Sequence, residues 1–401
     1  MKRRQFLVNL CATGACAGIA GILLDQAFNE AGSLQTDTRG RRSARDNYDL
    51  AAAKNTLKRI EEAGFPPREA MFWEKTPDGL IKCTLCPTFC ILRPYERGKC
   101  RVRFSLENKL VTVVYGHPCS VNIDPIEKKP VFHLIPGSKS FSIATAGCLL
   151  GCRYCQNWQI SQENPENLSS EEFLPEKVVQ AALATGCKSV AYTYTEPTIF
   201  YEYMYDTAKI AKEKNLYNVV VSCGYINPEP LKQLIPFLDV MKVDLKGFSE
   251  RFYQSVCGGS LEPVLATLQQ LAESKVLIDI VTLVVPTYND DREQMNLMFR
   301  WILEKLGPGV SFFLSRFQPT YQLKNLPPTP VNLMEKLRED AMKAGLKFVY
   351  LGNVPGSQGE NTFCPKCNKL LIGRIGYQLT DMNIKGGKCA FCAASIPGIW
   401  E

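Results

Sequence analysis

The feature that most constrains the fold is an alternation of predicted strands and helices through the centre of the chain. Short runs of apolar and β-branched residues are typical of buried strands, and they occur at residues 141–146, 189–194, 218–222, 238–245, 277–285, 310–317 and 348–354. Predicted helices separate most of them, at residues 175–185, 201–214, 291–306 and 332–344. A β/α repeat of about seven strands predicts an α/β fold with a parallel sheet or barrel. The chemistry of such folds lies on loops after the carboxyl ends of the strands.

Three cysteines follow the first predicted strand directly. Cys148, Cys152 and Cys155 have the spacing CxxxCxxC, and Tyr154 precedes the last of them. Three thiolates can hold a four-iron cluster and leave its fourth iron open, whereas four cysteines close an electron-transfer cluster of this type. The spacing alone also fits a zinc or disulfide knuckle, but its place after a strand of a β/α repeat favours a reactive cluster.

Cysteine usage favours metal sites elsewhere in the chain as well. The 17 cysteines are largely grouped in CxxC-like clusters, which indicate metal sites more than a disulfide framework. With only two histidines in the sequence, the ligands must be mainly thiolates, which suits zinc and iron–sulfur centres. The isolated cysteines are expected to be buried small apolar residues: Cys119, Cys187, Cys223 and Cys257. The net charge of +7 is modest, and no nucleic-acid partner is indicated.

Two further cysteine clusters flank the repeat. The C-terminal one has two CxxC knuckles and predicts a zinc-ribbon-like module, with an electron-relay cluster as the alternative: Cys364, Cys367, Cys389 and Cys392. In such a small module the metal supplies on the order of 10 kcal/mol of folding free energy. The N-terminal cluster suits either zinc or a second four-iron cluster, and the sequence does not separate them: Cys83, Cys86, Cys90 and Cys100.

The CxxxCxxC run resembles the signature of the radical S-adenosylmethionine (SAM) superfamily, and longer segments resemble one family within it. DPIEKKPVFH, CQNWQIS, AYTYTEPTI, VDLKGF, PPTP and GNVPG are similar to segments of the AmmeMemoRadiSam system radical SAM enzyme family, which is itself similar to the pyruvate formate-lyase activating enzymes. The likeness runs from about residue 80 to the last residue. It implies a partial (β/α) TIM-like barrel of the radical SAM type, flanked by the two cysteine-rich modules.

The resemblance also implies a reaction and the ligands of its cofactors. Cys148, Cys152 and Cys155 would hold a 4Fe-4S cluster whose open iron binds SAM, and Tyr154 would lie against the adenine. In the superfamily an electron from the cluster cleaves SAM, and the resulting 5′-deoxyadenosyl radical removes a hydrogen atom from a substrate.

Other SAM contacts carry over from the family position by position. Glu196, with Thr195 and Pro197, matches a Gly-Gly-Glu-Pro segment that meets the SAM amino group, although the two glycines are replaced here; an exposed glutamate is the alternative. Asp244 and Lys246 match an Asp-x-Lys near the methionine part of SAM, and their spacing places them on one face of a strand; a surface ion pair is the alternative. Weaker matches, for ribose and adenine contacts, are Ser222 and Val285.

The function expected from the resemblance is that of a radical SAM enzyme with an unknown substrate, which could be a protein. A glycyl-radical-enzyme activase is one specific version. A non-enzymatic zinc or iron–sulfur scaffold, or an electron-transfer protein, is the alternative of another class. The expected partners are a low-potential electron donor and, through the family name, proteins of the AMMECR and Memo families. No residue is assigned as catalytic.

The N-terminus has the layout of a twin-arginine export signal, with Arg3 and Arg4 ahead of an apolar run. The predicted organisation is a signal-like segment at 1–24, a linker with a helix at 25–77, a four-cysteine module at 78–135, a core domain at 136–356 and the ribbon-like module at 357–401. Because SAM and low-potential reductants are cytosolic, a cytoplasmic enzyme is favoured over an exported one, and membrane tethering stays open.

Overall fold

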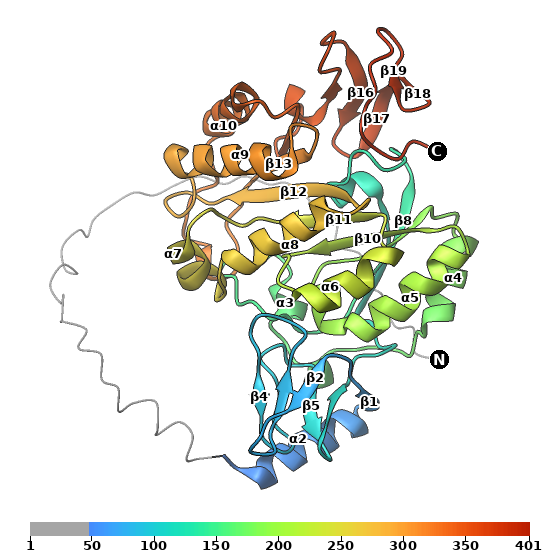
Figure 1. Cartoon of the computed structure of the whole chain (residues 1–401), viewed down its shortest axis with the longest axis vertical. Helices are drawn as coiled ribbons and strands as arrows, with labels where there is room; N and C mark the ends of the chain where they lie inside the picture. Colours follow the sequence, from blue (N-terminus) through green and yellow to red (C-terminus); the bar gives the residue numbers. More distant parts are fainter. Residues whose placement is uncertain (1–47) are drawn as a thin grey trace, which may run out of the picture. The chain divides into compact units, whose positions relative to one another are not determined.

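The structure is a computed structural model that describes residues 48–401. A parallel β/α repeat forms its centre (Figure 1). Seven strands lie side by side in chain order and pair in parallel, and they confirm the seven predicted strands: β8 (Lys139–Ala144), β9 (Ser189–Tyr192), β10 (Tyr217–Ser222), β11 (Val240–Asp244), β12 (Leu277–Val284), β13 (Ser311–Arg316) and β14 (Phe348–Gly352). Within residues 48–401 no ladder joins β14 to the opposite edge of the sheet, so the barrel is open.

An eighth strand, β7 (Ser120–Pro125), extends this sheet and pairs antiparallel with β8. It was not predicted from the sequence. Most of its side chains are half-buried or exposed, and it ends at Pro125, so it has little of the apolar pattern that marks a buried strand.

Helices connect the parallel strands and pack on the sheet through their buried residues, as Figure 1 shows for α5, α6 and α8. Helix α9 begins after Asp291, whose side chain accepts hydrogen bonds from first-turn N–H groups. The longer helices are α4 (Pro175–Ala184), α5 (Tyr201–Glu213), α6 (Pro228–Leu234), α8 (Glu262–Ala272), α9 (Arg292–Leu306) and α10 (Val331–Ala344). Two short ones are α3 (Trp158–Ser161) and α7 (Glu250–Phe252).

The N-terminal cysteine-rich part consists of one helix and two small antiparallel sheets. The helix is α2 (Leu50–Glu62). The first sheet consists of β1 (Arg68–Glu69), β6 (Lys109–Thr112) and β5 (Arg103–Leu106), and the second consists of β2 (Trp73–Lys75), β3 (Ile81–Cys83) and β4 (Ile91–Leu92). Strands β1 and β2 lie before residue 78 but pair with β6 and β3, so in the structure this part begins earlier than the segment 78–135.

The C-terminal part is built of short antiparallel strands and packs against the open side of the barrel. Its strands are β15 (Thr362–Phe363), β16 (Leu370–Ile375), β17 (Gln378–Met382), β18 (Ile384–Lys385) and β19 (Lys388–Cys389). Arg374 of β16 is buried, donates to the Phe132 carbonyl oxygen at 3.0 Å and lies over the Phe132 ring. Phe132 in turn packs on Phe313 and Tyr350 of the sheet, so this part shares a core with β13 and β14.

Among residues 48–401 no helix combines the length and the hydrophobicity needed to span a bilayer. The predicted twin-arginine-like segment at 1–24 lies outside the described residues, as does most of the predicted linker before α2.

Candidate active site

A cavity of about 690 Å³ opens at the carboxyl ends of the parallel strands. The loop after β8 contributes Cys148, Cys152 and Cys155 to its wall. The ends of β9 and β11 contribute Glu196 and Asp244. The segment between β7 and β8, at residues 127–132, and the C-terminal part complete the wall. The cavity lies where the sequence predicts the site, on loops after strand ends.

The three thiols of this loop differ in their surroundings. Cys152 is buried, and a hydrogen bond from the Cys257 thiol lowers the pKa of Cys152 to about 7 against the opposing effect of burial. Burial raises the pKa of Cys148 and of Cys155. The loop itself is held by backbone bonds, since the Gly151 and Arg153 N–H groups donate to carbonyl oxygens of the π-helical turn Tyr253–Cys257 that follows α7.

Tyr154 lines the same cavity. It is buried, its ring stacks on Phe252, and its hydroxyl lies 3.5 Å from the Cys257 sulfur. The π-helical turn therefore fixes the orientation of the aromatic ring that precedes Cys155.

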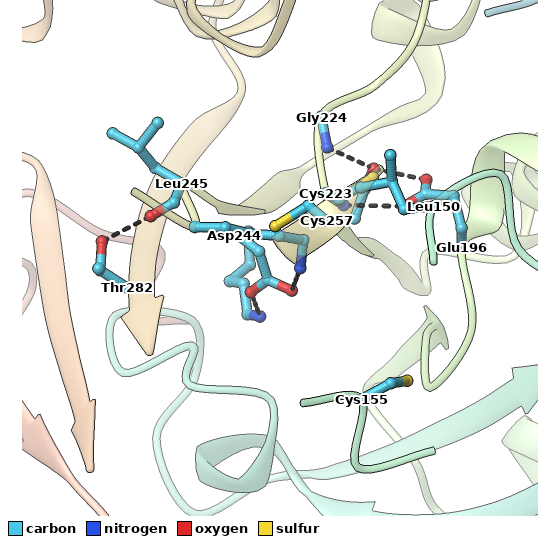
Figure 2. Close-up of polar contacts among 12 residues, drawn as sticks. Leu150, Cys155, Glu196, Cys223, Gly224, Asp244, Leu245, Cys257 and Thr282 are labelled. Carbon is cyan, nitrogen blue, oxygen red and sulfur yellow. Dashed lines mark hydrogen bonds and ion pairs between the residues drawn. The ribbon is translucent and has the colours of Figure 1, made fainter. Parts of the chain in front are cut away.

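Glu196 is almost completely buried at 2% exposure, so the alternative of an exposed glutamate is wrong. Its Oε1 accepts hydrogen bonds from the Thr198 N–H and hydroxyl and from Ser222, and its Oε2 accepts from the Cys223 N–H at 2.8 Å. Figure 2 shows Glu196 and Cys223 facing each other across the ends of two neighbouring strands. Buried charges are tolerated when they are hydrogen-bonded in this way, and the carboxylate is fixed at the cavity wall.

Asp244 lies at the end of β11 between two lysines. It pairs with Lys242 and, at 3.3 Å, with Lys246 (Figure 2). Burial favours the neutral acid, but the two ammonium groups outweigh it and hold the pKa of Asp244 below its ordinary value. All three side chains line the cavity and both lysines are largely buried, so the pair is part of the cavity wall and the alternative of a surface ion pair is wrong.

The other two predicted SAM contacts do not line the cavity. Ser222 is buried behind its wall and reaches it only through Glu196. Val285 is buried after β12, where its N–H donates to the Asn289 side chain at 2.6 Å. The structure thus brings Tyr154, Glu196, Asp244 and Lys246 together with the cysteine loop and leaves Val285 apart.

Several cavity residues were missed by the sequence analysis. Cys223 and Cys257 are buried, as expected of isolated cysteines, but Cys223 lines the cavity and Cys257 contacts the cysteine loop. Lys242 shares the inner face of β11 with Asp244, and the period of two along a strand could have revealed it.

A second charged group lines the same cavity, in the DPIEKKPVFH segment. Lys129 is buried, pairs with Asp124 at 2.5 Å and lies over the Tyr194 ring. Burial lowers the pKa of Lys129 to about 8 although Asp124 raises it. No local pattern joins these residues, because Asp124 lies in β7 and Tyr194 in the loop after β9, and they meet only in the folded protein.

The two outer cysteine sets differ in geometry. All four sulfurs of the C-terminal set lie within 4.8 Å of one another, and those of Cys364 and Cys392 are 3.6 Å apart. Zn–S bonds of about 2.3 Å in a tetrahedron place sulfurs about 3.8 Å apart, so this set fits a single ion. The N-terminal set instead lines a cavity of about 20 Å³, and its members are Cys83, Cys86, Cys90 and Cys100.

Comparisons with known proteins agree with this arrangement. The model of the radical SAM superfamily matches residues 142–298, which include the cysteine loop and the ends of β9 and β11. The chain is also 42% identical over 331 residues to the uncharacterized protein MJ0808 of Methanocaldococcus jannaschii, an alignment that covers 82% of this chain and 98% of that protein. The chain belongs to the radical SAM superfamily.

Activating enzymes are among its relatives. The pyruvate formate-lyase-activating enzyme of Staphylococcus epidermidis is 26% identical over 243 residues, which are 55% of this chain and 92% of that enzyme. Among solved structures, a radical SAM methyltransferase from Sphaerobacter thermophilus aligns with a TM-score of 0.45 and 14% identity over 79% of this chain and 86% of that one.

Membership of the radical SAM superfamily indicates an enzyme and implies a four-iron cluster and SAM as cofactors. The residues of the cavity fit both groups. Three thiols in the cavity wall can hold a cluster. A buried carboxylate and an aspartate–lysine pair lie after strand ends in the same wall, and the cavity has the volume of a small-molecule site.

Proposed function

We propose that the protein is a radical SAM enzyme that reductively cleaves SAM at a 4Fe-4S cluster held by Cys148, Cys152 and Cys155. When bound, the cluster supplies one electron that breaks the sulfonium bond and yields a 5′-deoxyadenosyl radical for hydrogen abstraction from a substrate. The observation that carries the proposal is that these thiols share one cavity with Glu196 and the Asp244–Lys246 pair.

The residues of the cavity have separate roles in this proposal. Lys246 offers its ammonium group to the carboxylate of SAM, and Asp244 holds that lysine in place. Glu196 presents a negative charge that suits the SAM amino group, and the ring of Tyr154 offers a face to adenine. The Cys257 thiol positions Cys152 and favours its thiolate, the form that binds iron.

Three finer assignments belong to the same proposal. The chain is a member of the AmmeMemoRadiSam family, linked to AMMECR and Memo proteins, and it takes electrons from a low-potential donor in the cytoplasm. The C-terminal cysteines hold a structural zinc, because their sulfur spacing matches a tetrahedral site. The substrate is itself a protein if the chain is a glycyl-radical-enzyme activase, a version favoured by the relative named pyruvate formate-lyase-activating enzyme.

The test is formation of 5′-deoxyadenosine by protein reconstituted anaerobically with iron and sulfide and supplied with dithionite and SAM. Product should disappear in Cys148→Ala, Cys152→Ala and Cys155→Ala, together with the iron that this loop holds. Both should persist in Cys119→Ala, a matched loss of a cysteine that lies outside all three sets. Zinc at every site with no iron would establish a scaffold instead, and a stable cluster in this loop with no product would establish an electron carrier.

A further inference from the structure

The four N-terminal cysteines line one small cavity. Their cavity of about 20 Å³ is otherwise lined mainly by apolar side chains, among them Leu92, Leu149 and Ile199. Within residues 48–401 the C-terminal set is the one group of three or more metal-ligating side chains whose ligand atoms all lie within 4.8 Å. The N-terminal thiols are therefore spread more widely than a single zinc ion would hold them, as are the three thiols of the CxxxCxxC loop.

We propose that Cys83, Cys86, Cys90 and Cys100 hold a second four-iron cluster, which passes electrons to the cluster of the CxxxCxxC loop. Four thiolates occupy every iron of such a cluster, so this one has no open corner for a substrate and is suited to electron transfer. Its role rests on the proposed function, but its presence does not.

The two sites share a wall. Cys148 and Leu150 line the large cavity, while Leu149, between them, lines the small one. Gly147 has a φ of +92°, and a Cβ there would lie 2.4 Å from the Cys100 carbonyl oxygen, so only glycine permits this contact. The backbone beside one N-terminal ligand therefore touches the backbone just before the first ligand of the other site.

The N-terminal site is also fixed and charged in a way that suits an anionic cluster. Arg103 is buried and donates from Nη1 to the Cys83 sulfur at 3.4 Å, while its other amino group pairs with Glu202. Hydrogen bonds to the sulfurs are one of the means by which proteins set cluster potential. Cys86 and Cys90 are only half-buried, so an external donor can approach the set at these two residues.

The electrons balance with one external reductant. A low-potential one-electron carrier reduces the N-terminal cluster by one electron, and that electron then moves to the oxidised cluster of the CxxxCxxC loop. Each SAM cleaved consumes one such electron. A chain whose two clusters are both reduced therefore stores two electrons, and a chain with one cluster stores one.

The presence of the cluster is tested without SAM chemistry, in the triple variant Cys148→Ala, Cys152→Ala, Cys155→Ala. After reconstitution this variant should retain about four irons per chain with the electron paramagnetic resonance of a reduced four-iron cluster, and one zinc. Two zinc ions and no iron, or no metal beyond the C-terminal one, would overturn the proposal. Further change of Cys86→Ala in this background should remove the iron, whereas Cys119→Ala should not.

The transfer is tested by counting turnovers without free reductant. Protein reduced with dithionite and desalted anaerobically is mixed with SAM, and 5′-deoxyadenosine is measured per chain. The wild type should approach twice the yield of Cys86→Ala, compared at equal occupancy of the CxxxCxxC cluster. Equal yields would refute the relay. No product from either protein would refute SAM cleavage instead and would leave the iron count to decide the second cluster.

Discussion

The Ser222 hydroxyl donates a hydrogen bond of 2.7 Å to Oε1 of Glu196, and so joins the end of β10 to the end of β9. The next N–H along β10, that of Cys223, donates to the other carboxylate oxygen. Every donor around Glu196 thus points at the ionised carboxylate, which is the form that the candidate site uses.

Glu196→Gln should weaken SAM binding. The amide lacks the negative charge that would face the SAM amino group, and a hydrogen bond to a charged group contributes about 1.5–3 kcal/mol, or about tenfold to hundredfold in affinity. The measurement is a SAM titration of reconstituted protein with matched cluster content. The control is Ser222→Ala, which keeps the charge of Glu196 and removes one hydrogen-bond donor, so SAM binding should weaken by at most about 1 kcal/mol. Unchanged SAM affinity in Glu196→Gln would show that Glu196 is not part of the SAM site.

Asp244→Asn should destabilise the protein, because it leaves two largely buried ammonium groups without their counter-charge. Breaking a buried pair costs about 3–5 kcal/mol, and the partial exposure of Asp244 reduces our expectation to about 2 kcal/mol. Urea denaturation at neutral pH gives the free energy of unfolding. The control is Glu62→Gln, which breaks the exposed Lys58–Glu62 pair and should change stability by less than about 0.5 kcal/mol.

Asp279 predicts a pH dependence of stability. It is completely buried in β12, and neither carboxylate oxygen has a close hydrogen-bond partner among residues 48–401. Burial raises its pKa to about 7 against the weaker effects of the Ser311 hydroxyl and Lys242. An unfolded aspartate has a pKa of about 3.9, so between pH 4 and 7 the folded chain holds a proton that the unfolded chain has released. The free energy of unfolding should fall as the pH rises through this interval.

Asp279→Asn removes that titration. The measurement is the free energy of unfolding of the variant minus that of the wild type, taken at pH 5.5 and at pH 7.5. This difference should be about 2 kcal/mol more favourable to the variant at pH 7.5 than at pH 5.5. Glu335→Gln, an exposed carboxylate on α10, serves as the control and should show no such gain. A constant difference across the interval would mean that the carboxyl of Asp279 is ionised throughout.

Removal of the proposed C-terminal zinc should open β16 and β17. The metal supplies on the order of 10 kcal/mol to a module of this size, so Cys389→Ala should lose zinc and most of the amide hydrogen-exchange protection of both strands. The control is Lys366→Ala, at an exposed position between Cys364 and Cys367, which should retain both the zinc and the protection. Full protection in zinc-free protein would show that the core shared with β13 and β14 is sufficient to keep β16 and β17 folded without the metal.

The barrel was predictable because its signals are local. Each buried parallel strand is a short apolar run, and chain order is also the order of the strands in the sheet, so residues that follow neighbouring strands meet at one edge. Cys148, Glu196 and Asp244 could therefore be placed together from sequence. The exposed edge strand β7 carries no such apolar signal and was missed.

The rest of the site depends on contacts between distant segments. Cys257 meets Tyr154 across a hundred positions of sequence, through a π-helical turn that no periodicity marks. Lys129 is held by Asp124 of β7 and by Tyr194 of the loop after β9. A lone cysteine and a lysine beside a proline look the same in a sequence whether they are structural or line a cavity, and only the fold distinguishes them.

The cavity rim is assembled from separate pieces of chain, and one of them is the turn between β16 and β17. Gly376 and Tyr377 of this turn line the cavity, Tyr377 is half exposed, and a side chain at Gly376 would meet open space. This hairpin can change in length or sequence without altering the strands that carry the cysteines and Glu196. Proteins that share the cysteine loop can therefore differ in what this cavity admits through a change in a single surface turn.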